Sequence, residues 1–206
     1  MRRRFLGIVF DLDGTLTTPH LLDYARMRAR INCPRGADIL SWVSSHAGEE
    51  RNAYETIVRE EESLGLDAVQ ASPHLSELFD KLSERCKKDG LTLGILTRNN
   101  ELVMNATLGK LFPKEDPFSL KISRDWRGGP PKPHPAALNH MAETWGVAAS
   151  ELIMVGDSAD DIQCSKAAGA LAVAFGPDPH AKALCDVHIS NLLDVEKILV
   201  GALYKE

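Results

Sequence analysis

The feature that most constrains this chain is a short apolar run that ends in two carboxylates. The residues from Gly7 to Phe10 are apolar and partly β-branched, and Asp11, Asp13 and Gly14 follow almost at once. Such a run predicts a buried strand that delivers its acids to a loop at its carboxyl end, where α/β sheets bind their ligands. Two like charges this close together are unfavourable unless a cation lies between them or one acid is protonated. The stretch therefore predicts a site that uses a metal ion, a proton or both.

The rest of the chain alternates between segments typical of strands and segments typical of helices. Further buried strands are expected at residues 91–97, 118–122, 152–155, 170–175 and 187–189. Helical patterns precede or separate these strands, except between the last two, and Ser72 is expected to cap the first of these helices, with Pro73 as its first residue. Strands separated by helices predict a Rossmann-like α/β fold, in which a parallel sheet carries helices on both faces.

A wholly helical pattern interrupts this alternation after the first strand. Apolar spacing predicts three helices, which begin near Leu21, Ala37 and Tyr54. The acidic run from Glu60 to Glu62 is expected on the solvated face of the third helix. The chain is therefore predicted to consist of an α/β core, residues 1–17 and 73–206, with a small inserted all-α cap, residues 18–72.

The composition limits the classes of function. The net charge is -5 and the sequence pI is about 5.8, whereas a nucleic-acid-binding surface needs a basic excess. No segment approaches the roughly 20 apolar residues that a membrane-spanning helix requires. The four cysteines are scattered without metal-ligand spacing, as expected for reduced thiols. A cytoplasmic monomer or weak dimer that binds neither nucleic acid nor membrane is expected.

Two later segments carry groups that suit a phosphate. The strand predicted at residues 91–97 ends in Thr97, Arg98 and Asn99, whose side chains can donate hydrogen bonds to phosphate oxygens beside a helix N-terminus. A simple helix cap is the other interpretation of this stretch. Lys132 lies between prolines, whose fixed φ angles restrict where its side chain begins.

Acids return after the strand predicted at residues 152–155, where Asp157 and Asp161 follow Gly156. Mg²⁺ prefers oxygen ligands, and Asp11, the backbone carbonyl of Asp13 and Asp157 could supply three of them. In one pocket these groups predict phosphoryl transfer. A carboxylate nucleophile forms an aspartyl-phosphate, and a second acid protonates the leaving oxygen and then activates water. The cation and a lysine neutralise the phosphoryl charge.

The order of these motifs resembles that of the haloacid dehalogenase superfamily. Asp11-Leu12-Asp13-Gly14-Thr15 is similar to its first motif, Thr97 to its second, Lys132 to its third, and Gly156-Asp157 with Asp161 to its fourth. The resemblance implies that Asp11 is the nucleophile and Asp13 the general acid and base. It also implies that Thr97 and Lys132 hold the phosphate, and that Asp157 binds Mg²⁺ with support from Asp161. The helical block resembles the cap of phosphoglycolate phosphatase-like members of subfamily I.

Side chains from both parts of the chain are expected to contact the substrate. Arg98 and Asn99 are the candidates from the core. Those from the cap are Tyr24, Arg26, Arg28, Arg30 and Arg35. The first three arginines of this set alternate along one helix, so they cannot all face the same pocket, and most are expected on the surface.

The predicted function is Mg²⁺-dependent hydrolysis of a small phosphorylated metabolite, a phosphate monoester. The resemblance implies that carbon–halogen cleavage uses the first acid without the second, so the presence of Asp13 favours phosphate chemistry. Two alternatives stay open. A phosphomutase of the β-phosphoglucomutase type would use the same core, and a non-catalytic binding protein could be built on the same fold.

Overall fold

A computed structural model describes residues 4–18 and 23–201, and the chain divides into two compact units. The first unit consists of Met1–Pro19 and Gln70–Glu206, and the second of His20–Val69. The boundaries expected from the sequence, at 17/18 and 72/73, lie two and three residues from the boundaries between these units. Each unit has its own hydrophobic core.

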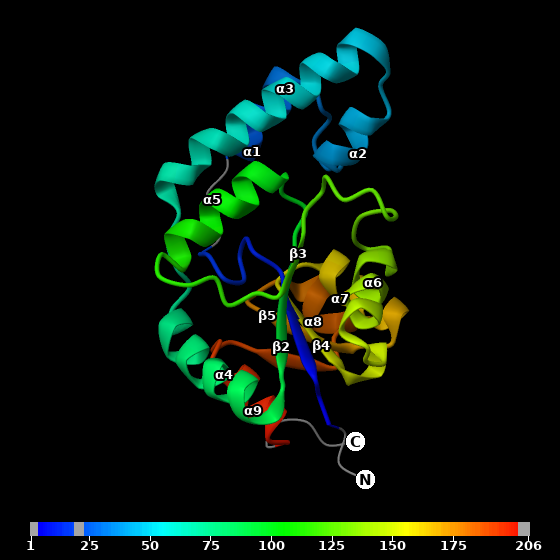
Figure 1. Cartoon of the computed structure of the whole chain (residues 1–206). Coiled ribbons are helices and arrows are strands. Elements are labelled where there is room, and N and C mark those ends of the chain that lie inside the picture. The colour runs from blue at the N-terminus through cyan, green and yellow to red at the C-terminus, as the bar shows by residue number, and fades with distance from the viewer. Residues whose placement is uncertain (1–3, 19–22, 202–206) are drawn as a thin grey trace. The chain divides into compact units, whose positions relative to one another are not determined.

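Within the described residues, a six-stranded parallel sheet forms the centre of the first unit (Figure 1). Its strands lie in the order β3-β2-β1-β4-β5-β6. In chain order they are β1 (Gly7–Phe10), β2 (Thr92–Leu96), β3 (Leu120–Ile122), β4 (Leu152–Gly156), β5 (Leu171–Phe175) and β6 (Val187–Ile189). Because β1 lies between β2 and β4 and is parallel to both, its two acids emerge at the middle of the carboxyl edge. The predicted parallel α/β fold is confirmed.

Helices cover both faces of this sheet (Figure 1). One face carries α4 (Leu75–Asp89), α5 (Glu101–Leu111) and α9 (Asp194–Leu199), and the other carries α6 (Ala136–Trp145), α7 (Ala159–Ala168) and α8 (Pro179–Leu184). Side chains alternate along β1: Phe10 packs against Phe79 of α4, with ring centroids 5.6 Å apart, whereas Val9 shares a cluster with Met141 of α6.

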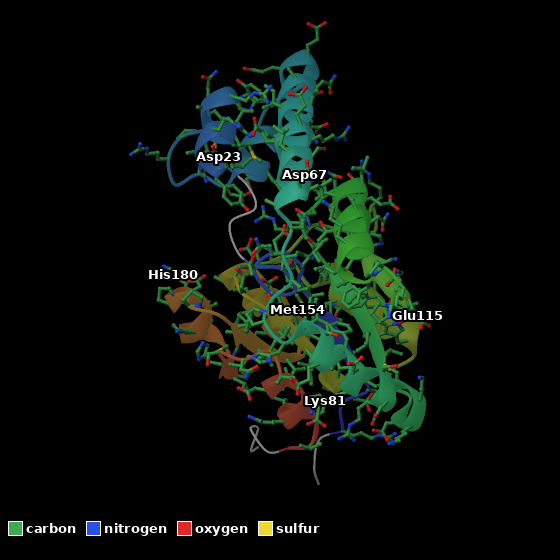
Figure 2. The ribbon with its side chains drawn as sticks, turned by 90° about the vertical axis from the view of Figure 1, so that its left-hand side faces the viewer. Asp23, Asp67, Lys81, Glu115, Met154 and His180 are labelled. Atoms are coloured by element: carbon green, nitrogen blue, oxygen red, sulfur yellow. The ribbon has the colours of Figure 1, made fainter. Side chains whose placement is uncertain are left out.

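The layers of this unit leave a clear division between interior and surface. Met154 of β4 is fully buried between the sheet and its helices, whereas Lys81 and His180 are exposed (Figure 2). None of the helices within residues 4–18 and 23–201 is long and apolar enough to cross a bilayer.

Two local expectations about these helices are wrong. Helix α8 was not expected, because its six residues are too few for a periodic apolar pattern. Its start is nevertheless encoded by Asp178, which accepts a hydrogen bond from the His180 N–H. Helix α4 begins at Leu75 instead of Pro73, and Ser72 does not cap it. The Ser72 hydroxyl donates instead to the backbone carbonyl of Thr15, 2.7 Å away.

The chain leaves the first unit and returns to it through two adjacent stems. Thr17 and Ala71 form an antiparallel bridge. One residue further on, the Ser72 N–H donates to the Leu16 carbonyl at 2.9 Å. Together with the bond from the Ser72 hydroxyl, these contacts fasten both stems to the loop that follows β1, so the insertion begins and ends at one place in the core.

The second unit is helical in its described part. It contains α1 (Tyr24–Arg30), α2 (Ile39–Ser44) and α3 (Gly48–Gly65), followed by a 3-10 turn at Leu66–Ala68. Its buried cluster consists of Met27, Ile31, Cys33, Ile39, Val43 and Val58. The expected start of the first helix at Leu21 lies outside the described residues. The third helix begins at Gly48, well before the expected start at Tyr54.

The acidic run of α3 does not lie on a solvated face as expected. Glu60 is exposed, but Glu61 and Glu62 are buried. Glu61 accepts hydrogen bonds from Arg26 Nε at 2.7 Å and from Arg30 Nη1 at 2.9 Å, both on α1. The sequence pattern missed this burial because the partners that stabilise the carboxylate lie on another helix.

Arg28 lies on a different side of α1 from these two arginines. Its Nη1 atom donates to the backbone carbonyls of Pro34 at 3.0 Å and Ala37 at 2.6 Å. The alternating arginines of α1 therefore do not share one pocket, as their spacing predicted, and all of them form bonds within the second unit.

Candidate active site

The acids that follow β1 lie beside the ends of both neighbouring strands. Phe10 is in register with Ile95 of β2 and with Val155 of β4. The pairing continues for one more residue, because the Asp11 N–H donates to the Val155 carbonyl at 2.9 Å. Asp11 is therefore level with the loops that follow β2 and β4, where parallel sheets bind ligands.

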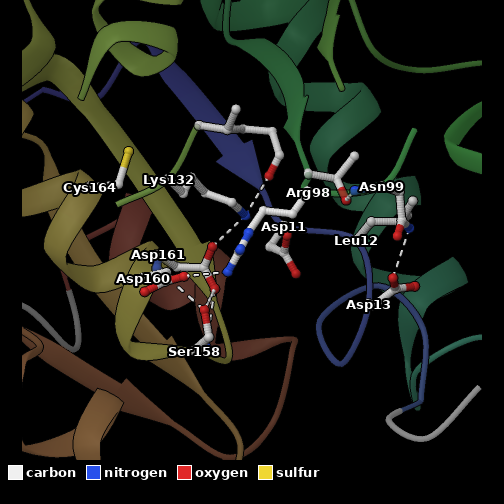
Figure 3. A network of polar contacts seen from close by, with 12 residues as sticks. Asp11, Leu12, Asp13, Arg98, Asn99, Lys132, Ser158, Asp160, Asp161 and Cys164 are labelled. Atoms are coloured by element: carbon white, nitrogen blue, oxygen red, sulfur yellow. Dashed lines mark hydrogen bonds and ion pairs between the residues drawn. The ribbon is translucent and has the colours of Figure 1, made fainter. Parts of the chain in front are cut away.

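Lys132 connects Asp11 to both of these loops through its ammonium group. Its Nζ atom donates to Asp11 Oδ1 at 2.5 Å, to Asp161 Oδ1 at 2.5 Å and to the Leu96 carbonyl at 2.7 Å (Figure 3). These acceptors use all three of its hydrogens, and the residue is only 4% exposed. Burial alone lowers the pKa of Lys132, but the two carboxylates outweigh it and raise the pKa. The ammonium is therefore charged.

Three carboxylates meet around this ammonium. Oxygens of Asp11, Asp157 and Asp161 all lie within 4.8 Å of one another. Two glycines make room for them: a Cβ on Gly14 would lie 2.2 Å from Asp157 Oδ2, and one on Gly156 would lie 2.3 Å from Asp161 Cγ. Any side chain at either position would therefore push these acids apart.

The crowding of acids and their burial shift two of the pKa values. Burial raises the pKa of Asp157 to about 7, and the charge of Asp161 adds to this rise. Burial also raises the pKa of Asp11 well above its usual 3.8, and Lys132 opposes this only in part. Three carboxylates against one ammonium leave two negative charges when all are ionised.

This charge and these ligand types fit a divalent cation. Mg²⁺ prefers carboxylate and carbonyl oxygens, and two unbalanced negative charges match its own. Asp11, Asp157 and Asp161 are three of the four predicted metal ligands. The fourth, Asp13, is expected to bind through its backbone carbonyl, and its carboxylate bonds elsewhere.

Ser158 is a site residue that the sequence predictions did not include. Its hydroxyl and its backbone N–H donate to Asp161 Oδ2, at 2.6 and 3.1 Å. The Asp161 N–H donates back to the Ser158 hydroxyl at 3.4 Å, which forms a capping box at the start of α7. A serine three residues before an acid is the sequence signal that could have identified it.

The residues that follow β2 have different contacts. Thr97 Oγ1 accepts a hydrogen bond from the Asn99 N–H at 3.1 Å, which leaves the hydroxyl hydrogen to be donated. Arg98 Nη1 bonds to Asp160 Oδ2 at 2.7 Å, and both side chains are partly exposed. The helix cap that the sequence suggested for Thr97 to Asn99 is made instead by the next residue, Asn100, whose side-chain oxygen accepts a bond at the N-terminus of α5.

Asp13 and Asp11 face different partners. Asn99 Nδ2 donates to Asp13 Oδ2 at 2.7 Å. In Figure 3, Asp13 is turned toward Asn99, whereas Asp11 is turned toward Lys132. The two acids of the opening motif are thus distinguished by their surroundings, with a neutral amide beside one and a cation beside the other.

Trp126 anchors the loop that carries Lys132. Its indole lies over the backbone of Gly128, where a Cβ would be only 2.1 Å from the ring. The ring also packs against His140 of α6, with centroids 5.3 Å apart. These contacts fix the loop to the helix that follows it.

Cys164 lies near the site but does not suit nucleophilic chemistry. It is fully buried, and its Sγ atom donates to the His134 carbonyl at 3.4 Å. Burial raises the pKa of the Cys164 thiol to about 12, so it is protonated at neutral pH. The carboxylate of Asp11 is therefore the more suitable nucleophile.

Comparisons with known proteins agree with this arrangement. Residues 8–175 match the family model described as haloacid dehalogenase-like hydrolase. A haloacid dehalogenase-like hydrolase domain-containing protein of Arabidopsis thaliana is 34% identical over 195 residues, which cover 86% of this chain and 76% of the relative. A phosphoglycolate phosphatase of Shigella dysenteriae is 28% identical over 207 residues, which cover 82% and 80%.

A solved structure shows the same fold. The crystal structure of a predicted phosphoglycolate phosphatase from Haemophilus somnus superposes with a TM-score of 0.73 over 94% of this chain and 97% of its own, at 22% identity. At that identity the likeness concerns the fold alone. The family model, in contrast, matches most of the sequence and spans every predicted motif residue from Asp11 to Asp161. The chain therefore belongs to the haloacid dehalogenase-like hydrolase family, as the order of its motifs predicted.

Proposed function

We propose that the protein is a Mg²⁺-dependent phosphatase that hydrolyses a small-molecule phosphate monoester. The observation that carries this proposal is the contact of Lys132 with Asp11 and Asp161, beside Asp157. Phosphoryl transfer depends on positioned groups that neutralise the phosphoryl charge. This cluster offers a carboxylate nucleophile, a buried cation and metal ligands together. The similarity to phosphoglycolate phosphatases supports phosphate esters as the substrate class.

The first half of the proposed reaction transfers the phosphoryl group to the protein. A carboxylate oxygen of Asp11 attacks phosphorus, and an oxygen–phosphorus bond forms as the bond to the leaving oxygen breaks. Asp13 gives its proton to that oxygen, so the leaving group departs as a neutral alcohol. The products of this half are an aspartyl-phosphate at Asp11 and an ionised Asp13.

The second half restores the protein. Asp13 accepts a proton from a water molecule, whose oxygen attacks phosphorus. The bond between phosphorus and Asp11 then breaks, which releases inorganic phosphate. Asp13 is again protonated and Asp11 is again an ionised carboxylate, so both groups return to their starting states.

Several side chains are proposed to hold the substrate. Thr97 has a hydroxyl hydrogen to donate, and Lys132 neutralises phosphoryl charge once one of its three acceptors is exchanged. Arg98 is partly exposed beside Thr97, and Asn99 Nδ2 keeps a second hydrogen besides the one that its carboxylate partner accepts.

The acidic cluster is proposed to hold the metal ion. Asp11, Asp157 and Asp161, with the backbone carbonyl of Asp13, are the residues that would bind Mg²⁺. When bound, the ion supplies positive charge to the phosphoryl oxygens.

The helical second unit is proposed to be the cap that selects the leaving group. The guanidinium groups of Arg26, Arg28 and Arg30 form bonds within that unit. Tyr24 and Arg35 are exposed, so they are the better candidates for contact with a substrate.

A phosphatase assay tests the proposal. Purified protein should release phosphate from p-nitrophenyl phosphate in the presence of Mg²⁺, and EDTA should abolish this activity. A panel of phosphoglycolate, sugar phosphates, nucleotides and pyridoxal phosphate, compared by kcat/KM, would identify the substrate. Failure to hydrolyse any member of the panel would contradict the proposal and favour a non-catalytic binding protein.

A further inference from the structure

We propose that Asn99 is a positioning residue for Asp13. The inference rests on the proposed phosphatase function, because that function gives Asp13 a proton to move. Asn99 Nδ2 donates to Asp13 Oδ2 at 2.7 Å, and the asparagine is only 7% exposed. The bond spans the loops that follow β1 and β2, so it fixes the acid to the neighbouring strand of the sheet.

The backbone of Asn99 is itself held from both sides. Its N–H donates to Thr97 Oγ1 at 3.1 Å, and its carbonyl accepts from the Arg124 N–H at 2.8 Å. Arg124 also donates from Nη1 to the Arg98 carbonyl at 3.1 Å. A side chain with a fixed backbone can fix the group that it binds, and small errors in the placement of a reacting group slow catalysis strongly.

The side chains that bind the two acids of the opening motif differ in charge. Asp11 has Lys132 as its partner, and that cation stabilises the ionised form which a nucleophile needs. The side chain of Asn99, in contrast, is neutral, and its hydrogen bond to Asp13 Oδ2 orients that carboxylate without adding a charge.

The role is tested by comparing substrates that differ in their need for a proton. The leaving group of p-nitrophenyl phosphate departs without protonation, whereas that of an alkyl phosphate such as ethyl phosphate requires it. In rapid-quench experiments, Asn99→Ala should slow aspartyl-phosphate formation from the alkyl ester about ten-fold more than from p-nitrophenyl phosphate. Equal losses for both esters would overturn the proposal.

Asn100 provides a matched control. It has the same side chain, is similarly buried and caps α5 through its own carbonyl oxygen. Asn100→Ala should therefore affect both esters by the same factor, through stability alone. In an Asp13→Ala background, Asn99→Ala should affect both esters by the same factor, because the difference between them acts through the missing carboxylate. A larger loss for the alkyl ester in that background would show that Asn99 acts by another route.

A spectroscopic measurement tests the contact without substrate or metal. The side-chain amide signals of Asn99, assigned by their absence in Asn99→Ala, should shift in Asp13→Ala, whereas those of Asn100 should stay in place. Unchanged Asn99 signals would contradict the contact. A wild-type protein that hydrolyses neither ester would overturn the phosphatase function and this role with it. An active wild type with equal losses would overturn the role of Asn99 alone.

Discussion

Buried carboxylates meet basic side chains in both units of this protein, but the charge balance differs. In the core, three acids surround the single ammonium of Lys132. In the helical unit, Glu61 is bound by Arg26 and Arg30, and Arg30 also bonds to Glu60 at 2.7 Å. The core cluster therefore has an excess of negative charge, whereas two acids and two arginines balance in the helical unit.

The pKa values follow this difference. Burial is the largest cause that raises the pKa of Asp11 and Asp157, and the charges of the neighbouring carboxylates add to the rise. The pKa of Glu61 is lowered instead, chiefly by its hydrogen bonds from Arg26 and Arg30. A balanced cluster stabilises the fold by itself, whereas an unbalanced one needs a further cation or a proton. This difference is the physical reason why we propose the site at the core cluster and a structural role for the helical cluster.

The largest effect on activity is expected from a substitution of Asp11 in the core cluster. Asp11→Asn should reduce phosphate release on the order of a thousand-fold or more, because an amide cannot replace the nucleophile. Asp160→Asn is the matched control, since Asp160 is partly exposed, bonds to Arg98 and is not one of the three acids of the cluster. It should retain most of the activity in the same assay. Activity that survives Asp11→Asn would remove the nucleophile assignment.

Removal of the cation from the core cluster should be the next largest effect. Lys132→Met should lower the free energy of unfolding by about 3 to 5 kcal/mol in metal-free buffer, because the carboxylates of Asp11 and Asp161 lose the buried ammonium that contacts both. Urea unfolding followed by circular dichroism measures this loss. Adding Asp161→Asn should restore part of it, and Lys166→Met on the surface should cost little. Similar losses for both lysines would contradict the buried role.

Addition of Mg²⁺ should stabilise the core cluster by adding positive charge, whereas Lys132→Met removes it. At a hundred times its Kd, a ligand that binds only the folded state stabilises it by about 2.7 kcal/mol. The wild-type protein should therefore melt at a higher temperature in Mg²⁺ than in EDTA, and Asp157→Asn should lose this increase. Glu61→Gln should keep it, because the helical cluster lacks the excess charge. An equal increase in all three proteins would argue against a site at Asp157.

Acidification should produce the smallest effect, and in the helical unit. Because the pKa of Glu61 is lowered from 4.5, its contribution to stability is complete above that pH and is lost as the pH falls through the lower, folded-state value. Hydrogen exchange in α1 and α3 should then rise about two- to five-fold, as for other partly exposed ion pairs. In Glu61→Gln this step should be absent. A step that persists in the variant would point to another carboxylate.

Much of the core and its motif positions was predictable from the sequence because the signals are local. A strand such as β1 is a continuous apolar run, and the acids that follow it need no distant information to be recognised. The same holds for Asp157, which follows the apolar run of β4. Even Ser158 had a local signal, since the spacing of a capping box is visible in the chain.

The contacts that distinguish the two acids of the opening motif were not predictable. Asn99 lies 86 residues from Asp13 in sequence, and only the register of β1 and β2 brings them together. Glu61 lies 35 residues from Arg26, so its helix alone could not show that it is buried. These contacts depend on tertiary packing, which neither propensity nor spacing records.

The two stems at Thr17 and Ala71 bear on how proteins of this design can diversify. The stems are bonded to each other and to the loop that follows β1. These bonds hold the ends of the insertion together in the core, whatever the length of the inserted segment. The entropy of closing a longer insert grows only with the logarithm of its length. One inserted segment could therefore be exchanged for another without resetting the register of the sheet, so that selectivity can evolve while the chemistry is inherited unchanged.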